Sequence, residues 1–186
     1  MMGRGIFGEN KNMAGATPFG RGRYAVPGKY MLELRAFSTK ESQDPSTKGN
    51  QLLIAEFSVM SFESTTYESY LDGKIKSTEG VFKVGDTLSE VVDTDDRKYG
   101  LVNSKELCAA VKHAVEIQRN NRADYSVDAA MAELSNDEAN GWVTDPDKNK
   151  NLIGLVFKLE AWNVSRTNSQ TKKPDDFTAK RLSSGV

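Results

Sequence analysis

The chain has 186 residues, of which 38% are apolar and 27% are charged, and its net charge is −1. This composition is typical of one soluble globular domain, and the near-neutral charge excludes a global basic field, so a nucleic-acid site must come from local clusters of Lys and Arg. The single cysteine, Cys108, excludes an intramolecular disulfide, and the lack of an apolar run of about 18 residues argues against a transmembrane helix.

Residues 1–27 are rich in glycine and carry interleaved cations and aromatic side chains, but they show neither helical nor strand periodicity. We therefore expect a flexible N-terminal arm. It is either a loose tail or a segment that orders on a partner, which is a phosphate backbone or a neighbouring subunit. The arm lacks the apolar stretch of a signal peptide, which together with the single cysteine favours a cytoplasmic protein.

The stretch Gly28–Phe62 predicts the β-hairpin around which the rest of the sheet is built. Its first run alternates with a period of two, which places leucines on one face and Arg35 and Phe37 on the other. Its second run, residues 51–62, has apolar residues on both faces, as a central strand does. The polar connection, residues 38–50, is typical of a long loop and predicts a mobile finger.

Further strands are predicted after the hairpin. Residues 63–77 favour a strand or an irregular crossover, and residues 80–94 favour two short strands joined by a turn at Gly85 and Asp86. The acidic cluster that follows, Asp93 to Asp96, lacks the glycine and distal glutamate of a calcium loop. A solvated turn is therefore favoured there over a metal site.

The clearest predicted helix spans residues 104–119, because its apolar residues recur on one face. Cys108 and His113 point to different sides of this helix, which disfavours a catalytic dyad, and the chain has too few such residues for a zinc site. A second short helix is expected at 126–134. We interpret residues 119–151 as a surface insertion that includes a flexible loop.

The closing unit, residues 152–182, predicts a second hairpin. Its first strand alternates and places Lys158 and Trp162 on one face. A polar loop follows, and then a short return strand.

Five strands with one helix inserted before the last two predict a mostly β (α+β) fold, an OB-like five-stranded barrel with long β-hairpin fingers that occupies residues 28–183. OB-type barrels bind single-stranded nucleic acid with cations that follow the phosphates and aromatic side chains that stack on bases. Both types occur on the two hairpins, although a solvated face beside a core explains them as well. The candidate nucleic-acid-binding residues are Arg35, Phe37, Lys40, Lys48, Lys158, Trp162, Arg166, Lys172, Lys173, Phe177, Lys180 and Arg181.

Motifs of catalysis are missing from the sequence. There is no phosphate-binding loop and no nucleophile elbow, and the single histidine leaves the chain without the usual general base. We therefore expect a protein that is not an enzyme and that uses neither a cofactor nor a metal.

Three patches carry a resemblance to a known family: PGKYMLELRAFSTKES with GNQLLIAEFSV, then SKELCAAVKHAV, and finally LIGLVFKLEAWN with DFTAKRLS. Together they cover about half of the chain, and they resemble a phage-encoded family of small OB-fold proteins that bind single-stranded DNA. The resemblance implies sequence-independent coating of single-stranded DNA during phage replication and recombination, in the cytoplasm of the host cell and without a cofactor.

The same features fit a second hypothesis, a viral structural or assembly protein such as a virion decoration, tail or connector subunit. An extended arm and long β-fingers are what a subunit uses to reach its neighbours in an assembly. Self-association through the N-terminal arm is expected in that case, and the near-zero net charge permits it.

Overall fold

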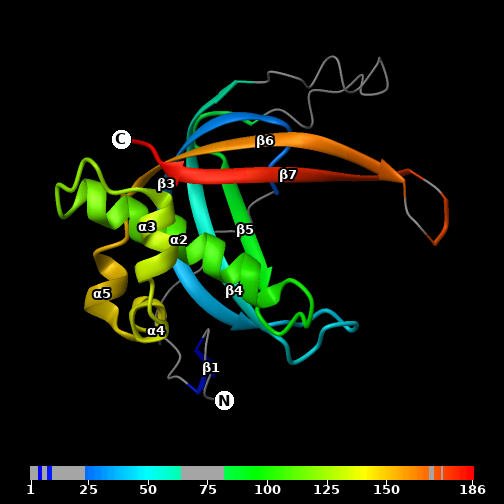
Figure 1. Cartoon of the computed structure of the whole chain (residues 1–186), viewed down its shortest axis with the longest axis horizontal. Helices are drawn as coiled ribbons and strands as arrows, with labels where there is room; N and C mark the ends of the chain where they lie inside the picture. Colours follow the sequence, from blue (N-terminus) through cyan, green and yellow to red (C-terminus); the bar gives the residue numbers. More distant parts are fainter. Residues whose placement is uncertain (1–3, 6–7, 10–23, 64–81, 168–169, 173) are drawn as a thin grey trace.

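The computed structural model describes residues 4–5, 8–9, 24–63, 82–167, 170–172 and 174–186. Within them, five antiparallel strands form a curled, half-barrel sheet in the order β5-β4-β3-β6-β7, and the helices come between β5 and β6 (Figure 1). The strands are β3 (Gly28–Glu41), β4 (Gln51–Glu63), β5 (Thr87–Asp93), β6 (Val156–Thr167) and β7 (Pro174–Ser184), beside the short pair β1 (Arg4–Gly5) and β2 (Gly8–Glu9). The helices are α2 (Gly100–Gln118), α3 (Val127–Glu133), α4 (Asn136–Thr144) and α5 (Pro146–Lys150).

This arrangement confirms the predicted fold class. Numbered in chain order within the sheet, the strands lie in the order 3-2-1-4-5, and the helices follow the third strand. That is an OB-like organisation, in which a curled sheet forms a partly open barrel. The outer strands of the described sheet are β5 and β7, so the barrel is open between them.

The core lies inside the curled sheet and is closed by α2. Inward side chains alternate along the strands, and the aromatic rings of Phe57 and Phe157 meet edge to face with centroids 5.5 Å apart. Val111 and Cys108 on α2 are completely buried against this core. Burial raises the pKa of the Cys108 thiol to about 12, so it is a neutral core group.

The prediction that Phe37 shares an exposed face with Arg35 is wrong. The β3–β4 register shifts between Leu34 and Ala36, which leaves Arg35 as an extra residue in β3. Such a bulge reverses the faces of the residues after it. Phe37 is therefore only 1% exposed, and its ring meets that of Trp142 edge to face.

The interpretation of residues 119–151 as a surface insertion is also wrong, since this segment forms three helices and contributes to the core. The predicted helix at 126–134 is confirmed, since the Ser126 hydroxyl accepts a backbone N–H at the beginning of α3. A further helix that was not predicted, α4, begins in the same way at Ser135. Trp142 on α4 is buried in the main core. The buried Asn149 amide donates to the carbonyl oxygens of Phe37 and Trp142 at 2.6 and 2.7 Å, which ties α5 to the bulged strand.

The packed domain begins before the predicted boundary at residue 28, since Ala25 and Val26 pack in the core and the Tyr30 hydroxyl donates to the carbonyl oxygen of Val26 at 2.6 Å. Most of the predicted arm lies outside the described residues, as does the segment 64–81. Among the residues described, no helix is both long and apolar enough to cross a membrane.

Candidate nucleic-acid interface

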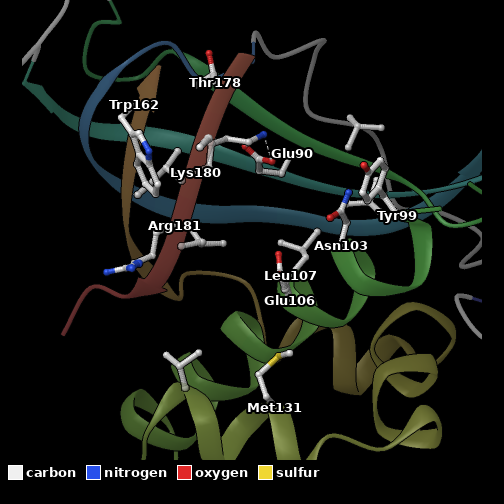
Figure 2. A pocket seen from close by; sticks show the side chains of 16 residues that line it. Glu90, Tyr99, Asn103, Glu106, Leu107, Met131, Trp162, Thr178, Lys180 and Arg181 are labelled. Atoms are coloured by element: carbon white, nitrogen blue, oxygen red, sulfur yellow. Dashed lines mark hydrogen bonds and ion pairs between the residues drawn. The ribbon is translucent and has the colours of Figure 1, made fainter. Parts of the chain in front are cut away.

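The opening of the barrel is a groove of about 840 Å³ between β5 and β7 (Figure 2). Side chains from β5, β6, β7, α2 and α3 line it, and its volume lies in the range of ligand-binding clefts. Apolar residues of the two helices, Leu107 and Met131, contribute to its wall. The groove is thus a half-apolar cleft bounded by the two outer strands.

One rim of the groove carries an exposed aromatic side chain, with two cations further along the same face. Trp162 is 41% exposed, and it lies opposite Ala179 in the β6–β7 ladder. Arg181, two residues further along β7, is a diagonal neighbour of Trp162 on the same outer face. Lys158 shares this face because it precedes Trp162 by four residues in one strand. The predicted pairing of cation and aromatic on β6 is therefore present in the structure.

Lys180 points the other way, into the opening. Its Nζ atom lies 2.6 and 2.8 Å from the two carboxylate oxygens of Glu90 on β5 (Figure 2). Paired strands lie only about 4.8 Å apart, whereas this contact joins β5 and β7 through two long side chains. The ion pair consequently bridges two strands that share no ladder within the described part of the sheet.

Tyr99 stands on the opposite side of this ion pair from Trp162 (Figure 2). Its ring is 47% exposed just before α2, and the Lys98 Nζ atom lies 4.9 Å from the ring centroid. The backbone N–H groups of Tyr99 and Lys98 both donate to the Asp96 carboxylate, and these bonds lower the pKa of that carboxyl group. Tyr99 was not among the predicted residues, although an aromatic directly after two cations, Arg97 and Lys98, was a usable signal in the sequence.

The acidic cluster at the end of β5 supports the first finger. Asp95 accepts the backbone N–H of Gln51 at 2.8 Å, and Asp93 accepts the Asn50 amide at 2.8 Å. In the described part of the chain, no three acidic, His or Cys side chains are grouped as metal ligands. The base of the 42–50 loop is thus tied to the end of β5.

The lysines of the fingers lie outside the groove. Lys40 and Lys48 are exposed on the first finger, and Lys172 is exposed in the second, where its φ of 57° puts it in the left-handed region. Both hairpins project to the right in Figure 1, because β3 curls strongly between its ends. The two fingers therefore flank the same side of the molecule.

Other predicted residues are not gathered around Trp162. Arg35 is exposed and pairs with Glu33 at 2.7 Å. It lies beyond the Glu33–Val156 end of the β3–β6 ladder, whereas Trp162 lies beyond the Gly28–Ala161 end. Lys173 lies outside the described residues, as do the side chains of Arg166 and Phe177.

The single histidine, His113 on α2, contacts both β7 and the segment before α3. Its Nδ1 atom accepts the Ser184 N–H at 3.3 Å, and Nε2 contacts the Tyr125 carbonyl oxygen at 3.0 Å. Neutral His113 with its proton on Nε2 satisfies both contacts. Burial lowers the pKa of His113, which favours this neutral form.

Neither a protein-family model nor a curated protein matches this chain.

Proposed function

We propose that this protein binds single-stranded DNA without sequence preference, in the replication or recombination of a phage genome in the host-cell cytoplasm. The observation that carries the proposal is the exposed Trp162, which shares the outer face of β6 and β7 with Lys158 and Arg181 at the rim of the groove. Stacking of a base on an aromatic ring contributes about 1–3 kcal/mol and accepts every base, so it suits binding without sequence preference.

The strand crosses the rim of the groove in this proposal. One base stacks on Trp162 and another on Tyr99, on the opposite side of the groove, while Arg181 and Lys158 contact the phosphates between and beside them. The fingers that carry Lys48 and Lys172 correspond to the loops that OB-folds use for oligonucleotides. The neutral net charge is compatible with this arrangement because the cations are local.

A fluorescence titration with oligo-dT tests the proposal. The chain has two tryptophans, and Trp142 is buried, so quenching on binding should come from Trp162. Trp162→Ala should weaken binding by about 1–3 kcal/mol with little change in salt dependence, since stacking releases no counterions. Arg181→Ala should instead flatten the slope of log affinity against log salt by about 0.7.

Trp162→Phe is the matched control, because it keeps a stacking ring and leaves Trp142 as the only indole. It should retain most of the affinity and lose the quenching. Binding that is equally tight in Trp162→Ala would show that the interface lies elsewhere. A wild-type protein without salt-sensitive binding to oligo-dT would refute DNA binding altogether.

A specific observation also favours the second candidate, an assembly subunit. β3 supports β6 only up to Ala161, and the ribbon of residues 162–167 and 174–179 extends beyond it without a third strand in the described sheet. Exposed strand edges are templates for pairing with another chain. Sedimentation of the wild type over a range of concentrations tests this candidate, which predicts oligomers that lose stability when Thr178, within this ribbon, is replaced by Pro.

A further inference from the structure

The ion pair in the groove places an anionic group on the Lys180 ammonium. Lys180 Nζ contacts both oxygens of the Glu90 carboxylate, at 2.6 and 2.8 Å. The Glu90 side chain is only 12% exposed, while that of Lys180 is 32% exposed. The carboxylate is thus the more buried partner, while the Lys180 side chain remains in contact with solvent.

A carboxylate and a phosphate bind an ammonium group through the same kind of interaction. Both are anions that accept short charge-assisted N–H bonds, and they repel each other when they share one cation. Of the four charged residues that line the groove, Glu90, Glu106, Lys180 and Arg181, two are acidic. An entering phosphate therefore meets a cation that is already neutralised.

We infer that Glu90 is a specificity-determining residue that competes with the DNA backbone for Lys180. This inference rests on the single-stranded DNA binding proposed above. Glu90 holds Lys180 in the free protein, and a backbone phosphate takes its place on the ammonium when a strand lies in the groove. Displacing Glu90 from Lys180 costs free energy. A ligand that is also bound at several other points, such as an oligonucleotide on Trp162 and Arg181, gains enough from those contacts to offset this cost, whereas a single nucleotide does not.

Removal of the competing carboxylate should tighten binding, the opposite of what the loss of an ordinary structural contact does. With a fluorescent oligo-dT of about 16 nucleotides, Glu90→Gln should bind about three- to fivefold more tightly than wild type, the upper part of the range that the loss of a partly exposed ion pair allows. Glu90→Ala should show the same gain. In a Lys180→Gln background, Glu90→Gln should change the affinity by less than about twofold.

Glu133→Gln is the matched control. It makes the same change in net charge on α3, outside the groove, where the carboxylate accepts the Tyr125 hydroxyl. Equal tightening in Glu133→Gln would reduce the effect to general electrostatics and overturn the inference. So would unchanged or weaker binding by both Glu90 variants, as long as their melting temperatures show that they are folded.

The two proposals fail in different ways in this experiment. If the wild type binds oligo-dT and the Glu90 variants gain nothing, single-stranded DNA binding stands and the competition is refuted. If neither the wild type nor Glu90→Gln binds in a salt-sensitive manner, both are refuted.

Discussion

The two long hairpins have similar alternating sequences, yet the fold holds them in different ways. The β3–β4 hairpin lies in the middle of the sheet, with β5 on one side and β6 on the other, and hydrogen bonds from the acidic turn fix its base. The β6–β7 hairpin lies at the edge, and only its inner half pairs with β3. The same pattern of residues therefore forms a core element in one case and a projecting ribbon in the other, according to what flanks it.

The sharpest test of this difference lies within one strand. Phe157, in the inner half of β6, is completely buried, so Phe157→Ala should lower the free energy of unfolding by about 3–5 kcal/mol. Trp162→Ala, five residues further along, should lower it by about 1 kcal/mol or less because the side chain is partly exposed. Urea denaturation measures both. Similar losses in the two variants would show that the outer half of β6 is also part of the core.

A smaller effect is expected where the first hairpin is fixed to the helices. Asn149→Ala removes the amide that donates to the carbonyls of Phe37 and Trp142, and should cost about 1–3 kcal/mol because two buried acceptors lose their partner. Asn151→Ala is the control: that side chain is exposed at the end of α5, and its loss should leave the urea midpoint nearly unchanged.

The base of the first finger gives a local test. Asp95→Ala removes the acceptor of the Gln51 N–H and should cost about 0.5–1.5 kcal/mol, with faster amide exchange at Gln51. Asp44→Ala makes the same charge change at the tip of the finger, where the carboxylate accepts the Ser46 N–H. Exchange at Gln51 should be unaffected by it. If both variants accelerate amide exchange at Gln51 equally, the acidic cluster does not hold the finger.

The smallest effect is a dependence of stability on pH at the end of β7. Burial holds the pKa of His113 below its ordinary value of 6.5, so the unfolded chain takes up a proton more readily than the folded protein. The contribution of neutral His113 is present above about pH 6.5 and is lost as the pH falls through the folded-state value. His113 is the only histidine, so His113→Gln should flatten thermal stability between about pH 5 and 7. An unchanged dependence of thermal stability on pH would contradict the role of neutral His113 as the acceptor of the Ser184 N–H.

Alternation and turn chemistry were sufficient to predict the five strands of the sheet, the inserted helix and the shared face of Lys158 and Trp162. They also predicted a short strand before Gly85 that is wrong, since residues 82–84 form no strand. They could not predict the bulge at Arg35, because an extra residue leaves no mark in a periodic pattern, and for that reason Phe37 was assigned to the wrong face. The contact of Glu90 with Lys180 joins residues 90 positions apart, and it depends on how far the sheet curls. Local sequence carries no information on such a pairing.

Cys108 makes the separation of α2 from the sheet measurable. Its thiol is completely buried where α2 meets the core, and a pKa of about 12 leaves almost no thiolate to react. A maleimide therefore modifies the native protein only when α2 separates from the sheet, so the rate of labelling counts these openings. A second cysteine introduced at the exposed Lys172 would be labelled at once. One chain then carries a fast and a slow site, and the ratio of their labelling rates gives the free energy for the separation of α2 from the sheet.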